Sequence, residues 1–105
     1  MGPFWQALHN AGAEIVVNGH AHDYERFAPM DPSGNADSAS GIREFVVGTG
    51  GIGEDTTYVE HANSVVFNPN TSGVLKLTLR QNGYDWQFVP VAGETFTDSG
   101  SGTCH

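Results

Sequence analysis

The sequence is poor in basic residues, in cysteine and in long apolar runs, and each shortage excludes a class of function. Only 4 of its 105 residues are Lys or Arg, against 12 Asp and Glu, so the formal charge is −8. Nucleic acids and anionic membranes are bound through cationic surfaces, so we expect neither as a partner. No apolar run approaches the ~20 residues of a membrane span, and we expect no secretory signal at this start.

A single cysteine, Cys104, lies next to the last residue. It is either a free thiol on a frayed end or half of a disulfide whose partner lies outside this chain. Cysteine usage therefore does not indicate a compartment.

Apolar residues are also fewer than usual, whereas glycine is abundant. Hydrophobic residues make up 38% of the chain, and 14 residues are glycine. A chain of this length forms one domain at most, with a modest core. The composition favours a domain rich in strands and loops, and is not low enough in apolar residues for disorder.

The first third reads as half of an α/β unit. A helix is predicted from Pro3 to about Ala11, with Pro in the first turn and Gly12 as its terminator. A short β-branched strand follows over 14–18, and then the loop Gly19–His22. The apolar positions of the helix are Phe4, Ala7, Leu8 and Ala11. Chemistry in such units lies beyond the carboxyl end of the strand, where this loop falls.

The middle of the chain alternates strand and turn signals. Residues 24–28 alternate weakly, 31–40 are turn-forming and polar, and 43–47 predict a strand. The glycine-rich run 48–53 lacks the Lys-Ser/Thr of a phosphate loop, so we interpret it as a backbone turn. Residues 54–63 show no periodicity and predict a loop.

The last third predicts a β-hairpin. Residues 74–80 and 84–89 alternate cleanly, and Asn82-Gly83 between them is a strong hairpin signal. From Gly93 onward the chain is mostly Gly, Ser, Thr and Asp, which is typical of a surface strand or a flexible tail over 93–105. Overall, we expect an α+β domain with a short N-terminal helix and a mostly antiparallel sheet.

His20 and His22 are the residues best suited to metal chemistry. In an extended segment, positions i and i+2 project to the same side, with α-carbons about 6.6 Å apart. Two such imidazoles can bind one ion, or two ions about 3.5–4 Å apart as in two-metal hydrolases. Gly19 before them lets the backbone turn sharply.

The block Gly19-His20-Ala21-His22-Asp23-Tyr24-Glu25-Arg26 resembles the final Gly-His-X-His block of calcineurin-like metallophosphoesterases, and its Tyr-Glu-Arg continuation is similar to the purple acid phosphatase branch. The segments 44–51, 73–89 and 95–100 resemble parts of that family in the same order. The resemblance implies the C-terminal half of an α/β/β/α sandwich, extracellular or periplasmic in the parent protein.

The resemblance also implies roles for individual residues. His20 would bind the second metal and His22 the first, with Fe(III) paired with Zn, Mn or Fe(II). The reaction would be hydrolysis of a phosphate ester by a metal-activated hydroxide. Asp23 is either an acceptor for an imidazole N–H or a turn or surface carboxylate. Tyr24 and Arg26 are interpreted as structural, packing and pairing beneath the loop.

The chain departs from the family in what it lacks. The family builds its site from five blocks: Asp-X-His, Gly-Asp, Gly-Asn-His, a lone His and Gly-His-X-His. Only the last is present. A catalytic zinc site normally uses three protein ligands, and two histidines are one short. We therefore expect 1–105 to be a single partial domain that is inactive alone.

The other histidines carry no comparable signal. We interpret His9 as a surface residue of the helix, His61 as a surface loop residue and His105 as a mobile terminal residue.

Three functions remain open: a C-terminal segment of a metallophosphoesterase, a free-standing metal-binding module that self-associates to complete a histidine site, and a minimal phosphatase assembled the same way. The first is preferred, and the minimal phosphatase ranks last because no bridging carboxylate motif is present. Either a missing N-terminal portion or a homo-oligomer would cover the exposed strand edges.

Overall fold

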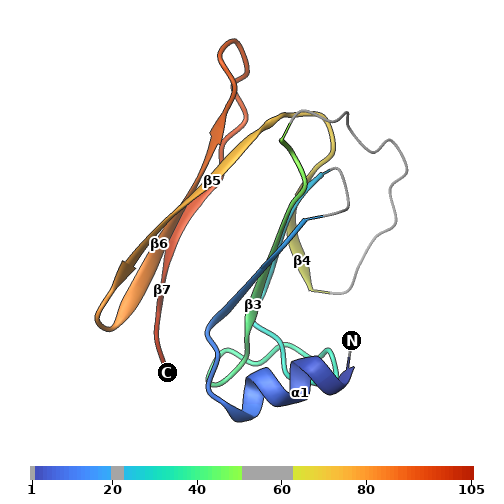
Figure 1. Ribbon diagram of the computed structural model, residues 1–105, viewed down its shortest axis with the longest axis vertical. Helices are drawn as coiled ribbons and strands as arrows, with labels where there is room; N and C mark the ends of the chain where they lie inside the picture. The colour runs from blue at the N-terminus through green and yellow to red at the C-terminus, as the bar shows by residue number, and fades with distance from the viewer. Residues whose placement is uncertain (1, 20–22, 51–62) are drawn as a thin grey trace.

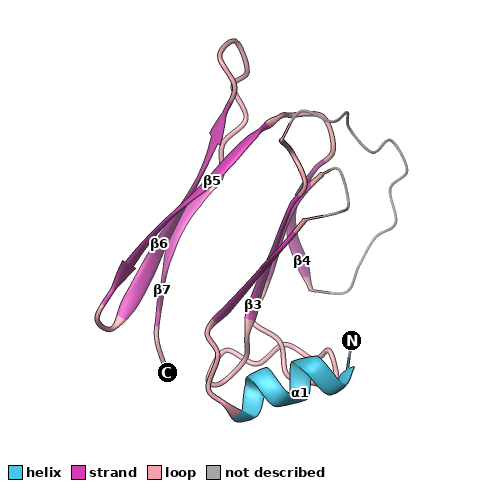
Figure 2. Cartoon of the chain, in the orientation of Figure 1, coloured by secondary structure: helices cyan, strands magenta, loops and turns pink. Residues whose placement is uncertain are grey.

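The computed structural model describes residues 2–19, 23–50 and 63–105 (Figure 1). This part of the chain contains one short helix and strands in two sheets, which are mostly antiparallel (Figure 2). The α+β class is therefore confirmed. The elements are α1 (Gly2–Asn10), β1 (Ile15–Asn18), β2 (Tyr24–Phe27), β3 (Arg43–Val47), β4 (Ser64–Asn68), β5 (Gly73–Arg80), β6 (Gly83–Pro90) and β7 (Ser99–Thr103).

Helix α1 ends as the sequence predicts, but it presents a different face. Gly12 has φ +79°, and the amides of Gly12 and Ala13 donate to carbonyls of the last helical turn, as in a Schellman cap. The predicted apolar stripe faces solvent, since Phe4 is 72% exposed. Trp5 makes the contact instead, and its indole N–H donates to the Met30 carbonyl over 3.4 Å. The helix thus lies against the loop before β3, with the predicted stripe on its exposed side.

The first sheet has the order β1-β3-β2-β4. Strands β1 and β3 are parallel, with Ile15 opposite Arg43, and the other neighbours are antiparallel. Strand β3 has the predicted bounds. Strand β4 was not predicted, because its short run Ser64–Asn68 follows a segment with no periodic signal.

The second sheet, in the order β5-β6-β7, contains the predicted hairpin with a shifted turn. Arg80 pairs with Gly83, so the turn residues are Gln81 and Asn82 and Gly83 begins the return strand. A Cβ on Gly83 would lie 2.7 Å from the Gly102 carbonyl oxygen. Glycine at this position therefore serves the close approach of β7.

The segment 93–105, expected to be a surface strand or a flexible tail, carries strand β7 at Ser99–Thr103. Its glycines fit beneath aromatic rings of β6, with Gly100 opposite Trp86 and Gly102 opposite Tyr84. A Cβ at either glycine would lie within 2.5 Å of the facing ring. The glycines that made this segment look like a tail are therefore what allows the aromatic rings to cover the strand.

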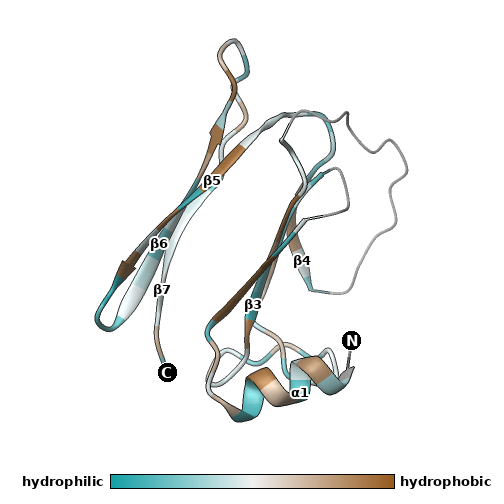
Figure 3. Ribbon diagram, in the orientation of Figure 1, coloured by the Kyte–Doolittle hydropathy of each residue, from teal (hydrophilic) through white to brown (hydrophobic). Residues whose placement is uncertain are grey.

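The two sheets pack face to face around an aromatic core. Tyr24 and Phe45 of the first sheet meet Trp86 and Phe88 of the second, with ring centroids 4.7 Å apart for Tyr24–Phe88 and 5.5 Å for Phe45–Trp86. Apolar residues occur along strands of both sheets (Figure 3). The predicted alternation in the hairpin therefore points the aromatic residues of β6 inward.

Candidate functional site

The predicted ligands His20 and His22 lie outside the described residues, as does His61. The structure describes the two ends of their loop, Gly19 after β1 and Asp23 before β2.

Both ends of this loop meet the carboxyl end of β3. The Gly48 amide donates to the Asp23 carbonyl over 3.0 Å, and the position of a Gly19 Cβ is 3.9 Å from the Val47 carbonyl oxygen. Thr49 continues the contact into the second sheet, since its hydroxyl donates to the Gly73 carbonyl over 2.9 Å. Because β1 and β3 are parallel, their carboxyl ends share one edge, the position that hosts chemistry in α/β units.

Asp23 is buried, with 7% exposure, and Glu25 is buried at 2%. The interpretation of Asp23 as a surface carboxylate is therefore wrong. Its contact with an imidazole N–H stays a prediction, since the histidines are outside the described residues.

Tyr24 and Arg26 both bind the carboxylate of Asp98. The Tyr24 hydroxyl donates to Oδ2 over 2.6 Å, Arg26 Nε donates to Oδ2 over 2.8 Å, and Arg26 Nη2 donates to Oδ1 over 3.2 Å. The two strand residues that follow the histidine loop are thereby fixed to the C-terminal segment. Sequence reasoning missed Asp98, because a lone Asp among Thr and Ser gives no signal of a partner more than 70 residues away.

This network shifts the pKa values of its members. Burial, then the hydrogen bond and charge of Asp98, raises the pKa of Tyr24 above its ordinary range. Burial alone would raise the pKa of Asp98, but the hydrogen bonds and charge of Arg26 and the Tyr24 hydroxyl outweigh it and lower this pKa. Asp98 is thus held as a carboxylate and Tyr24 as a neutral phenol, which suits a structural pairing.

Two arginines contact the ring of Trp86 in the core. The guanidinium carbons of Arg26 and Arg43 are 4.9 and 4.8 Å from its ring centroid. Both cations are attracted to the electron-rich ring faces.

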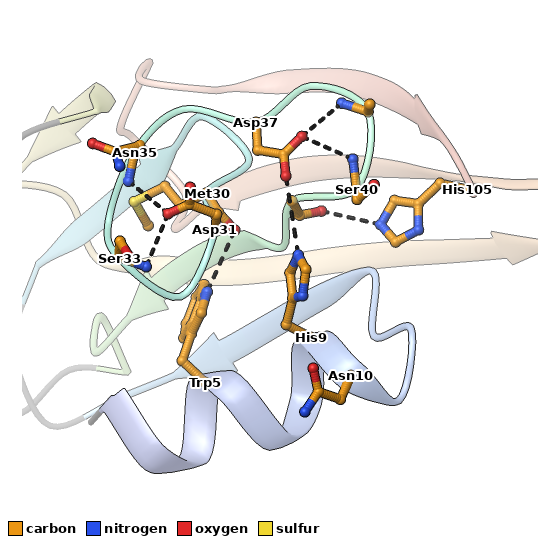
Figure 4. A network of polar contacts seen from close by, with 12 residues as sticks. Trp5, His9, Asn10, Met30, Asp31, Ser33, Asn35, Asp37, Ser40 and His105 are labelled. Carbon is orange, nitrogen blue, oxygen red and sulfur yellow. Dashed lines mark hydrogen bonds and ion pairs between the residues drawn. The ribbon is translucent and has the colours of Figure 1, made fainter.

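His9 lies beside the Asp37 carboxylate at the other end of the sandwich (Figure 4), and His105 lies beside the Glu14 carboxylate. His9 Nε2 is 4.0 Å from Asp37 Oδ2, and its side chain is 24% exposed, so it is half-buried between the helix and the loop. The His105 amide donates to Glu14 Oε1 over 2.8 Å. The terminal residue, expected to be mobile, is thus hydrogen bonded to the segment before β1.

The described residues offer no complete metal site. In residues 2–19, 23–50 and 63–105, no group of three or more His, Cys, Asp or Glu side chains is arranged to hold an ion. Cys104 is exposed and forms no disulfide within the described chain. The donors present therefore do not by themselves fit a dinuclear centre.

No protein-family model, curated protein or solved structure matches this chain. None of the described helices is both long and apolar enough to cross a membrane.

Proposed function

We propose that this chain is the C-terminal segment of a dinuclear metal-dependent phosphoesterase of the calcineurin-like, purple acid phosphatase-like type. His20 and His22 would each supply one ligand to a pair of transition-metal ions, with Zn, Fe or Mn as candidates. Such ions activate a water molecule as hydroxide and polarise a phosphoryl oxygen. The substrate would be a phosphate ester and the parent protein extracellular or periplasmic, corresponding to half of an α/β/β/α sandwich.

One observation carries the proposal. The ends of the Gly-His-Ala-His loop, at Gly19 and Asp23, lie at the shared carboxyl edge of two parallel strands, with Asp23 bonded to Gly48 over 3.0 Å. Short polar loops at such edges are the usual place for ligands in α/β folds. Tyr24 and Arg26 immediately afterwards are fixed by Asp98, which gives the loop a rigid support on its β2 side.

The open side of the sandwich supports the idea of a missing portion. Parallel strands are normally buried on both faces. Here β1 is a parallel strand with no neighbour beyond it in the described sheet, and Val17 is 48% exposed. Leu79 at the end of β5 is 73% exposed, although Leu75 and Leu77 on the same face of the strand are half-buried. Additional strands would cover both residues.

The test begins with the coding sequence upstream of Met1. We expect it to continue in frame with the four absent ligand blocks. In the isolated chain, purified without a histidine tag, we expect weak zinc binding by calorimetry and no turnover of p-nitrophenyl phosphate. The double variant His20→Ala/His22→Ala should weaken zinc binding at least tenfold, a loss of about 1.4 kcal/mol. His9→Ala, which removes a histidine from the helix, is the matched control.

If the double variant and the unsubstituted 105-residue chain bound zinc with equal affinity, the proposal would be contradicted. The mass in solution separates it from its alternative, the self-associating module. A monomer with and without zinc agrees with a segment of a larger enzyme. Zinc-dependent oligomers that require His20 and His22 would favour the self-associating module. The net charge of −8 works against self-association, because copies of the chain repel one another.

A further inference from the structure

A small cavity lies at the end of the sandwich opposite the histidine loop. Its volume is about 250 Å³, and its lining includes Glu14, Arg43, Tyr84 and His105. Arg43 is the first residue of β3. Gly48, which contacts Asp23 at the end of the histidine loop, comes directly after the last residue of that strand. The length of β3 therefore separates this cavity from the proposed metal edge, and the two sites are distinct.

Arg43 differs from the other two arginines of the chain in having no acidic partner among the described residues. Arg26 binds Asp98 and Arg80 binds Asp85, with shortest N–O distances of 2.8 and 3.1 Å. No carboxylate of the described residues lies within 4.0 Å of the Arg43 nitrogens. Its contacts are the Tyr84 hydroxyl at 3.3 Å from Nε, the Phe27 carbonyl at 3.5 Å from Nη1, and the Trp86 ring.

Among the described residues, these contacts occupy two of the N–H donors of the guanidinium. A guanidinium carries five N–H donors, and the two bonds to Arg43 are at the long end of the normal range. The residue is half-buried and lines the cavity, so solvation is only partial. A partly buried cation of this kind is normally paired with an anion.

The charges around the cavity select the kind of anion. Glu14 also lines it, but its carboxylate is engaged by His105, through the backbone amide at 2.8 Å and ring Nδ1 at 3.3 Å. The Arg43 charge is therefore available, while the nearby Glu14 disfavours a second negative charge. A planar monoanion that accepts two parallel N–H bonds fits this arrangement best.

We propose that Arg43 anchors a binding site for a small monocarboxylate at this end of the sandwich. The Tyr84 hydroxyl, held beside Arg43 Nε, lies where it can contact the same ligand. The volume of about 250 Å³ is below the range of drug-sized pockets, so the ligand is a small acid.

The test is a titration of the ¹⁵N-labelled full chain with sodium acetate at constant ionic strength, with sodium chloride as the reference titration. Saturable chemical-shift changes are expected at Arg43 Nε–H and at the indole N–H of Trp86, whose ring is 4.8 Å from Arg43 Cζ. The indole of Trp5, on helix α1, is the internal control and should not move. Chloride should cause no saturable chemical-shift changes, because a spherical ion cannot accept two parallel N–H bonds from the planar guanidinium.

Two variants make the test specific. Arg43→Lys keeps the charge but loses the two-pronged geometry, and should weaken acetate binding about tenfold, as expected for one lost charged hydrogen bond. Glu14→Gln keeps an acceptor for the His105 amide and removes the competing charge, so it should tighten acetate binding roughly three- to tenfold. Arg80→Lys, in an exposed arginine pair, is the matched control and should leave the affinity unchanged.

The proposal is overturned if acetate shifts are linear and equal to those with chloride, or if Arg43→Lys binds acetate like the parent chain. Should Arg43→Lys fail to fold, Glu14→Gln decides: unchanged or weaker acetate binding contradicts the proposal. Inorganic phosphate that binds as tightly as acetate at a pH where it is a dianion would contradict the selection for a single charge.

Discussion

Replacing Asp98 with alanine is expected to destabilise the protein strongly, because one carboxylate satisfies two buried groups. The Asp98 side chain is 9% exposed and accepts from both Tyr24 and Arg26. Its removal leaves the Arg26 guanidinium, 14% exposed, without its acidic partner inside the sandwich. It also leaves the hydroxyl of the fully buried Tyr24 without its acceptor.

The magnitude follows from what remains buried. Removing one partner of a buried ion pair costs about 3–5 kcal/mol, mostly because the other charge stays desolvated. The Arg26 stack on the Trp86 ring survives in the variant and keeps the loss toward the lower end of that range. A domain of this size has a total unfolding free energy of about 5–15 kcal/mol, so the loss should be a large fraction of it.

Urea unfolding monitored by circular dichroism and tryptophan fluorescence measures the effect. Asp85→Ala is the matched control, because Asp85 also pairs with an arginine, Arg80, but both side chains are at least 43% exposed. An exposed pair contributes about 0–1 kcal/mol. Asp98→Asn should fall between the two, since an amide oxygen still accepts one bond. If Asp98→Ala costs no more than Asp85→Ala, the network does not hold the two sheets together and the reasoning fails.

Three further outcomes are expected. The pKa of Asp98 is lower in the folded state than in the unfolded state, so the ionised carboxylate stabilises the fold fully above about pH 4. This stabilisation is lost as the pH falls through the pKa of the folded state. The unfolding free energy of Asp98→Asn should therefore depend less on pH in this acid range. The pKa of Tyr24 is raised, so its stabilisation is present below about pH 10 and lost as pH rises, and Tyr24→Phe should resist alkaline unfolding better than the parent chain. Gly102→Ala should cost about 1–3 kcal/mol in urea unfolding, because its Cβ would meet the Tyr84 ring at 2.4 Å, whereas Gly50→Ala, with open space around it, should cost less than 0.5 kcal/mol. Equal losses for the two glycine variants would show that ring contact is not what excludes a side chain.

The sequence predicted those parts of the fold that depend on local pattern. The hairpin over β5 and β6 follows from strict alternation, and the end of α1 follows from Gly12. The turn shifted by one residue because Gly83 is fixed by its approach to Gly102, which lies in another strand. Strand β4 was missed for the same reason, since its pairing with β2 joins segments that are distant in the sequence.

In the candidate site too, the features that depend on local pattern were predicted and the long-range contacts were not. That the Gly19–His22 loop follows a strand was predicted from the β-branched run before it, and β1 ends at Asn18 as expected. That Asp98 supports the far side of the loop was not predictable, because the tail around it has neither apolar periodicity nor a ligand motif. Contacts made by single polar residues over long separations leave no pattern in a sequence.

The positions of the cations sharpen the argument drawn from composition. The net charge of −8 already disfavours polyanionic partners, but that count treats all four basic residues as surface charge. Arg26 and Arg43 lie against the Trp86 ring in the core, and Arg80 is paired with Asp85. Lys76 is thus the exposed cation with no acidic partner among the described residues. Three acidic side chains, those of Asp23, Glu25 and Asp98, are buried as well, so the surface stays strongly acidic. Among the described residues, an anion meets an unpaired cation at Lys76 and in the cavity that Arg43 lines.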